Sequence, residues 1–144
     1  MKAERVKVAE VQSDVSAVGT LIAADSVVIR PEIAGRVMGL HFQEGQLVAK
    51  GAKLVTLDPA EYRAQLAGTS ADARTEKMRH DRAKELLEKG FISKEAVDVA
   101  QGNMERALAK QQQDEVLLSK TTIVAPFSGI VGLRQISPGA YLRA

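Results

Sequence analysis

The sequence predicts an α+β fold in which an antiparallel helical hairpin is inserted into a small β-module. Two stretches, residues 29–37 and 124–131, resemble each other: in each, a proline precedes a small residue and a glycine, and a valine follows two positions later. A further glycine lies ten residues on in both, at Gly45 and Gly139. Residues 59–119 between them have a helical pattern, so we expect one β-module that is divided at its centre by helices.

The first part of the chain has the pattern of β-strands. Residues 6–11 and 26–29 contain period-two or continuous β-branched runs. We expect N-terminal strands within residues 1–24 and the first half of the β-module in residues 25–58. Short apolar pieces alternate with glycines in this half, as is typical of strands joined by tight turns.

The pattern changes to that of a helix at Asp58. An aspartate can cap a helix, proline suits its first position, and Glu61 completes a capping-box pattern. The predicted helix runs over about residues 59–89 and ends at Gly90, which suits the C-terminal capping position.

A short link leads into a second predicted helix over about residues 94–119, with Ser93 as its N-cap. If the chain folds back at residues 90–92, residues whose numbers sum to about 183 face each other. The facing positions have apolar ends and a small or polar middle, which predicts a thin antiparallel coiled coil with a weak core. The seam is Leu66, Thr69, Ala73, Glu76, His80, Ala83 and Leu87 on the first helix and Val97, Ala100, Met104, Ala107, Gln111, Asp114 and Leu118 on the second.

Residues 120–144 repeat the first half of the β-module incompletely. The repeat relates Gly129 to Gly35 and places Ala144 at the position of Lys50. A counterpart of residues 54–57 is then missing, so we expect a fragment that lacks at least one strand and a following domain.

Composition argues against several classes of function. The net charge is +2 and aromatic residues make up 3% of the chain, which gives no reason to expect a nucleic-acid partner. There is no cysteine, and His41 and His80 are solitary and lie in different elements. Glu76 and His80 have the spacing of an ordinary polar helix pair rather than of a metal site. We therefore predict no enzyme activity, no catalytic residue, no cofactor and no metal site.

The order of several short motifs resembles the lipoyl-like and hairpin core of periplasmic adaptor proteins of tripartite efflux pumps. This family is also called membrane fusion proteins, the HlyD and RND adaptors. The resemblance covers about residues 17–144 and implies a split lipoyl-like β-sandwich with an inserted coiled-coil hairpin. The motifs are Gly19–Leu21, Ala34–Val37, Glu44–Gly51, Leu54–Asp58 and Ala125–Gly129.

The predicted end of the hairpin carries a second match to the family. Arg82, Leu86 and Ser93 have the spacing of the residues that, in the family, engage a TolC-like outer-membrane channel. The resemblance implies that the arginine binds carbonyls or a carboxylate, the leucine fills an apolar position and the serine bonds polar groups. Without it, Ser93 would only cap a helix, Arg82 would be a solvated charge and Leu86 would pack beside the seam.

The family resemblance implies a periplasmic adaptor that links an inner-membrane RND-type transporter to the channel and exports drugs or other toxic small molecules. It also implies self-association into a ring and an inner-membrane anchor in a segment absent from this chain. The alternatives are an adaptor of an ABC-type exporter or type I secretion system and, from another class, a structural coiled-coil scaffold. A true lipoyl or biotinyl carrier is disfavoured, because the hairpin occupies the place of the carrier's lysine turn and Lys77 lies within a predicted helix.

Overall fold

Two long helices interrupt a series of short strands in the computed structural model, which describes residues 14–143. The helices are α1 (Ala60–Glu88) and α2 (Lys94–Ser119). Both lie where the sequence pattern predicts a helix, and the α+β class follows from their combination with strands. The strands are β1 (Gly35–Leu40), β2 (Leu47–Val48), β3 (Lys53–Leu57), β4 (Thr122–Val124), β5 (Gly129–Ile130) and β6 (Tyr141–Leu142).

The strands form two antiparallel sheets. The larger has the order β4-β3-β1-β6, and the smaller consists of β2 and β5. Both sides of the helices thus contribute to the larger sheet, because its central strands β3 and β1 precede the helices whereas its outer strands β4 and β6 follow them. Neither half of the chain can form this sheet alone, so the repeated stretches build one module.

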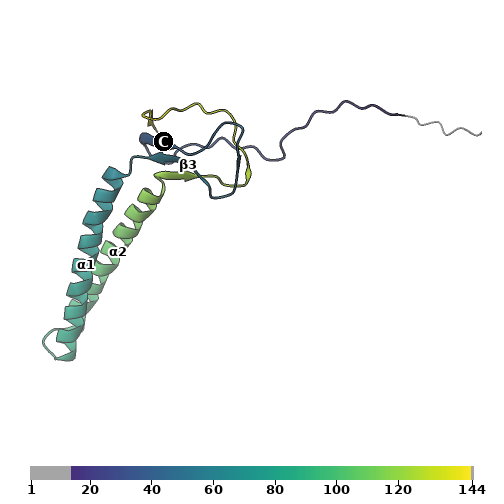
Figure 1. The fold of residues 1–144 in the computed structure, drawn as a ribbon. Helices are drawn as coiled ribbons and strands as arrows, with labels where there is room; N and C mark the ends of the chain where they lie inside the picture. The colour runs from purple at the N-terminus through teal and green to yellow at the C-terminus, as the bar shows by residue number, and fades with distance from the viewer. Residues whose placement is uncertain (1–13, 144) are drawn as a thin grey trace, which may run out of the picture.

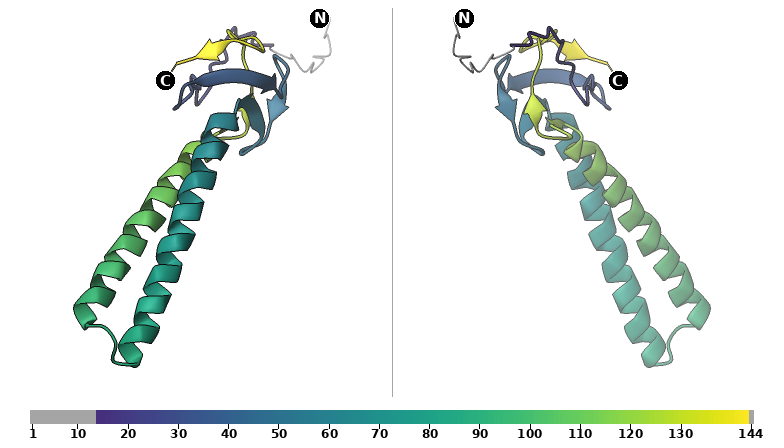
Figure 2. Two further views of the ribbon diagram at one scale, coloured as in Figure 1. Left: turned by 90° about the vertical axis from the view of Figure 1, so that its left-hand side faces the viewer. Right: turned by 90° about the vertical axis from the view of Figure 1, so that its right-hand side faces the viewer.

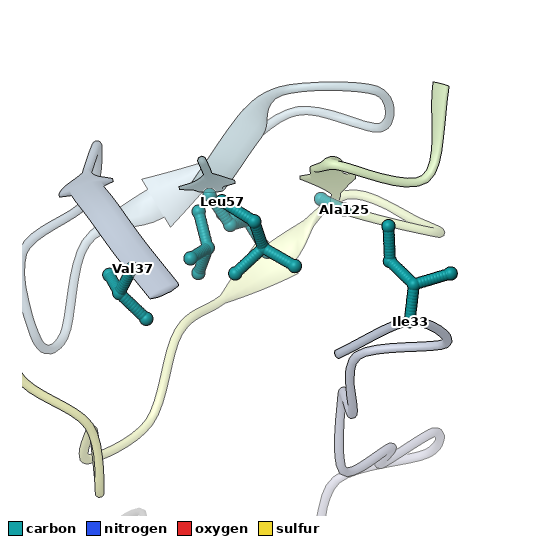
Figure 3. Packing of buried hydrophobic residues seen from close by; sticks show 6 residues of the cluster. Ile33, Val37, Leu57 and Ala125 are labelled. Carbon is teal, nitrogen blue, oxygen red and sulfur yellow. The ribbon is translucent and has the colours of Figure 1, made fainter. Parts of the chain in front are cut away.

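A single apolar core joins the two sheets. Its centre is Leu57 of β3 and Val37 of β1, whose side chains are 0% and 1% exposed. Figure 3 shows how Ile33 and Ala125, from opposite halves of the sequence, contribute to the same cluster. Val48 of β2 packs against it as well, which ties the smaller sheet to the larger one. Burial of these side chains is the main stabilising contribution available to so small a module.

The helices project from one end of the β-module and lie side by side along their length (Figures 1 and 2). Both predicted seam sets are buried or partly buried, and most other positions on the helices are exposed. The most deeply buried seam residues are Thr69 and Ala73 on α1 and Val97 and Asp114 on α2. The two helices therefore pair through the predicted faces, while their coiled-coil packing stays a prediction.

Neighbouring strands carry the two helices. β3 leads into α1 and α2 leads into β4, and these strands pair with Thr56 opposite Thr122. The N–H of Leu57 donates to the carbonyl of Thr121 at 2.7 Å, which closes the pairing at the point where the helices begin. The helix pair thus replaces a tight turn between two adjacent strands.

The start of α1 differs from the prediction by one position. Pro59 is the N-cap, no capping box forms, and the Asp58 carboxylate accepts a 3.0 Å hydrogen bond from the N–H of Ala60. The reason is a contact distant in sequence: the N–H of Asp58 donates to the carbonyl of Arg36 at 2.8 Å and keeps Asp58 with the sheet.

The strand expected at residues 26–29 is not formed. Residues 14–34 contain no strand or helix, and residues 14–24 run away from the β-module (Figure 1). The strand predicted at residues 6–11 lies outside the described residues. Propensity alone does not make a strand without a partner, and residues 26–29 are paired with no other strand in the part of the chain that the structure describes. Among residues 14–143, no helix is long and apolar enough to cross a membrane.

Candidate functional site

The turn between the helices is the candidate site, and hydrogen bonds between near neighbours in sequence hold its two ends. Lys89 is the C-cap of α1, and Gly90 follows with a φ of 76°, a conformation that favours glycine. The N–H of Gly90 donates to the carbonyl of Leu87, and the N–H of Phe91 to that of Leu86, each at 2.9 Å. These two bonds form a Schellman motif, which ends α1 and satisfies its last carbonyls.

Ser93 begins the second helix. Its backbone is extended, with φ −81° and ψ 159°, and its hydroxyl oxygen accepts a 3.3 Å hydrogen bond from the N–H of Ala96. This confirms the predicted N-cap role, which supplies a partner for one free N–H of the first turn. The residue remains exposed, so its hydroxyl proton also faces solvent.

Arg82 and Leu86 lie one turn apart near the end of α1. Arg82 is exposed and forms no ion pair with any residue between 14 and 143, so its guanidinium donors are available. Leu86 is partly buried, and its carbonyl is held by the Schellman motif. The helix spacing places both residues on one face, while Ser93 lies across the turn at the start of α2.

Phe91 is a feature of this site that the sequence reasoning missed. It lies in the turn between the helices and is 73% exposed. The signal was available, because Phe91 lies in the short link between two predicted helices, where side chains are usually at the surface. The end of the helix pair therefore combines a cation without an ion pair in residues 14–143, a partly buried leucine, an exposed aromatic ring and a serine hydroxyl. Such a set suits recognition of another protein, because arginine and large aromatic side chains dominate binding energy at interfaces.

The base of the helix pair is fixed to the β-module. The Tyr62 hydroxyl donates to the carbonyl of Ala34 at 2.9 Å, and Leu117 packs against the apolar core. The Lys120 ammonium lies 2.7 Å from the Glu32 carboxylate. The distal residues are thus mounted on a defined base.

Comparison with known proteins identifies the family. Residues 25–144 match the family described as RND MFP, barrel-sandwich hybrid domain. The chain belongs to this family of RND membrane fusion proteins. Members are membrane fusion adaptors rather than enzymes, which agrees with the non-enzymatic interpretation of the sequence.

Individual membrane fusion proteins show the extent of the similarity. The multidrug resistance protein MdtA of Escherichia coli strain 55989 is 33% identical over 135 residues, which cover 84% of this chain and 32% of MdtA. MdtA of Yersinia enterocolitica is 32% identical over 138 residues, or 86% of this chain and 31% of that protein. The chain thus spans about a third of the length of these curated relatives.

Two solved structures have the same fold over most of this chain. A MacA–MexA chimera that contains the Pseudomonas aeruginosa MexA α-hairpin domain superposes with a TM-score of 0.75 and 26% identity, over 78% of this chain and 41% of the chimera. A putative efflux transporter from Bacteroides eggerthii gives a TM-score of 0.72 and 25% identity, over 77% of this chain and 34% of that one.

Proposed function

We propose that this chain is the core of a periplasmic adaptor that connects an inner-membrane RND-type transporter to a TolC-like outer-membrane channel. The exported compounds would be drugs or other toxic small molecules. The observation that carries the proposal is the exposed Arg82, which has no ion pair among the described residues and lies one turn from Leu86 and across the turn from Ser93, at the far end of a projecting helix pair. The MdtA relatives, which are multidrug resistance proteins, support it.

The β-module and the helix pair have different proposed roles. The lipoyl-like halves, residues 25–58 and 120–144, form the mount, and residues 59–119 form an antiparallel coiled coil that carries the docking residues. The 29 residues of α1 span about 44 Å at 1.5 Å per residue, so the turn lies far from the β-module. Residues 1–24 are proposed to lead from a β-barrel or membrane-proximal region.

Each distal side chain has a proposed role in docking. Arg82 donates to backbone carbonyls or a carboxylate on a channel helix, because its five donors are unpaired within the described chain. Leu86 and Phe91 supply apolar contact area, and the Ser93 hydroxyl donates to a polar group. In a ring of identical adaptors, several such contacts act together and raise the affinity well above that of one.

The RND description of the matching family favours an RND-type transporter over the alternative of an ABC-type exporter or type I secretion system. The proposed location is the periplasm, with anchoring to the inner membrane through a segment outside this chain. Self-association into a ring, through side-by-side contacts of the β-modules, completes the proposal.

Substitution of the distal residues in the full-length adaptor tests the docking role. Cells that express it with its transporter and channel would carry Arg82→Asp or Ser93→Asp. Arg82→Asp reverses the charge that meets the channel, whereas Ser93→Asp keeps an N-cap acceptor and adds a negative charge to the docking surface. Both variants should lower efflux-dependent drug tolerance at least about tenfold and abolish cross-linking to the channel, since loss of one buried polar partner costs on the order of 2 kcal/mol per contact.

Arg74→Asp is the matched control, because Arg74 is likewise exposed on α1 but lies in the middle of the helix. It should leave tolerance and cross-linking unchanged. Wild-type behaviour of both distal variants would refute docking through this turn, whereas equal loss in the control would assign the effect to helix charge in general.

A further inference from the structure

The paired helices have two flanks, one on each side of their seam. Successive residues are about 100° apart around a helix, so a residue directly before a seam residue lies on one flank and a residue directly after it lies on the other. In an antiparallel pair, the positions before seam residues lie on the same side in both helices. We call that side the first flank, and the side of the positions after seam residues the second flank.

A groove of about 400 Å³ lies on the first flank of α1, in the half of the helix next to the β-module. Gly68 opens its middle, since a Cβ atom there would meet nothing within 4 Å. Glu61 and Asp72 place an exposed carboxylate near each end. The lining residues are Glu61, Ala64, Gln65, Gly68, Thr69 and Asp72. The groove is therefore an acidic depression that a cationic side chain from outside the molecule can enter.

The two flanks of α1 carry charges of opposite sign at the same height. Asp72 on the first flank is followed two positions later by Arg74 on the second, and neither forms an ion pair with a residue between 14 and 143. Seven residues further on the signs are exchanged, with Arg79 on the first flank and Asp81 on the second. All four residues are exposed, and Lys84 on the second flank is an exception to the exchange.

The other helix, α2, adds charge of one sign to each flank. Arg106 and Lys110 directly precede seam residues and lie on the first flank. Glu105 and Glu115 directly follow seam residues and lie on the second flank. All four are exposed, and within the described part of the chain none forms an ion pair. Opposite charges of α2 thus lie on different flanks and do not meet within one molecule.

A second helix pair that runs in the same direction at the same height brings these charges together. When the first flank of one copy meets the second flank of the next, Asp72 lies level with Arg74 and Arg79 lies level with Asp81. The basic and acidic flanks of α2 meet as well. A neighbour displaced by seven residues, about 10 Å, would instead place Asp72 beside Asp81. The charge pattern therefore favours one direction and one height.

We propose that the helix pair of one copy binds the helix pair of a second copy, first flank against second flank, parallel and in register. This contact rests on the proposed function, because it adds an interface along the helices to the proposed ring of β-modules. The two flanks are different surfaces, so the contact repeats from copy to copy until a ring closes. The neighbour's Arg74 then lies beside the groove and Asp72. Each exposed ion pair contributes little, so a single reversal such as Arg74→Asp is tolerated.

Disulfide cross-linking between copies tests the arrangement in the full-length adaptor, expressed with its transporter and channel. Gln65→Cys on the first flank and Ala67→Cys on the second have the spacing of Asp72 and Arg74, in a background without other cysteines. Residues two positions apart on a helix do not face each other, so the joint variant links only between chains. Oxidation should give a ladder of dimers, trimers and larger species, whereas each single variant should stay monomeric.

Charge reversal decides whether the ion pairs specify the contact. Asp72→Lys with Arg106→Glu reverses the first flank, and Arg74→Glu with Glu105→Lys reverses the second. Each reversal brings like charges together and should lower the cross-linked fraction about tenfold or more. All four substitutions in one chain exchange the signs of both flanks and should restore the ladder, which a variant that had merely lost its fold would not do.

Absence of the ladder with wild-type charges, an intact ladder in either reversal, or no recovery in the combined variant would overturn the proposal. Dimers from Gln65→Cys alone would also overturn it, because they require two first flanks to meet. Cross-linking to the channel is scored in the same cells. An intact ladder without channel cross-linking would support the contact between helix pairs while refuting docking through the turn.

Discussion

At the scale of single residues, Tyr62 shows how one hydrogen bond connects the helix pair to the β-module. Its ring packs against the apolar core, and its hydroxyl donates to the carbonyl of Ala34, directly before β1. The ring thus contributes apolar burial and its hydroxyl satisfies a backbone acceptor. Nothing in the local pattern distinguishes this tyrosine, because its partner lies 28 positions earlier in the sequence.

Tyr62→Phe should therefore lower the free energy of unfolding by about 1 kcal/mol, because the ring stays while the Ala34 carbonyl loses its donor. Urea denaturation followed by circular dichroism measures the change. Tyr141→Phe is the control, since Tyr141 is largely exposed and its hydroxyl has no hydrogen-bond partner within residues 14–143, and it should have no effect. Equal stability of the two variants would show that the Ala34 bond contributes nothing.

Residues whose conformation depends on near neighbours could be predicted from the sequence, and those that depend on distant partners could not. Gly90 and Ser93 take the predicted capping roles because their hydrogen bonds span only a few positions. Asp58 is displaced from its predicted cap by Arg36, and residues 26–29 lack the partner that a strand requires. Arg82 and Leu86 were identified as docking residues from the spacing of the family's motif, and their role in docking stays a prediction.

At the scale of elements, the helix pair has a regular seam that contains one buried carboxylate oxygen without a hydrogen-bond partner among the described residues. The seam was predictable because a helical period of 3.6 residues and a tight turn together determine which residues face each other. Asp114 is the exception to favourable burial: it is 3% exposed, and its Oδ2 atom has no hydrogen-bond partner among the described residues. The predicted register places it opposite Thr69, whose hydroxyl donates to carbonyls of its own helix instead.

Asp114→Asn should raise the free energy of unfolding by about 1 kcal/mol, because an amide of the same shape removes an uncompensated buried charge. Equilibrium urea unfolding at neutral pH measures the difference. Asp72→Asn, at an exposed position on α1, should change stability by less than about 0.5 kcal/mol. A loss of stability in Asp114→Asn would show instead that the carboxylate has a stabilising partner.

At the scale of the whole molecule, the module and the helix pair are continuous in structure. The repeat builds two sheets around one core, and the helices extend from two paired strands of the larger sheet. The proposed adaptor role requires the turn to lie at a defined distance from the module. That distance is determined by helix length and can be altered without touching either end.

Removal of residues 73–79 from α1 and 104–110 from α2 shortens both helices by the same facing heptad and keeps the seam in register. The protein should fold, with helical circular dichroism reduced in proportion. Its turn should lie about 10 Å closer to the module, at 1.5 Å per residue. Efflux-dependent drug tolerance should then be lost although Arg82, Leu86 and Ser93 are intact, and retained tolerance would contradict a spacing role.

The pairing of β3 with β4 couples the orientation of the helix pair to that of the sheet. Because each of these adjacent strands continues into one helix, a rotation of the sheet end turns both helices together instead of separating them. Over the length of α1, a rotation of about 5° at the sheet displaces the distal turn by about 4 Å, as the helix rise of 1.5 Å per residue dictates. Small changes of twist near the strands are thereby amplified into movements as large as a side chain at the far end.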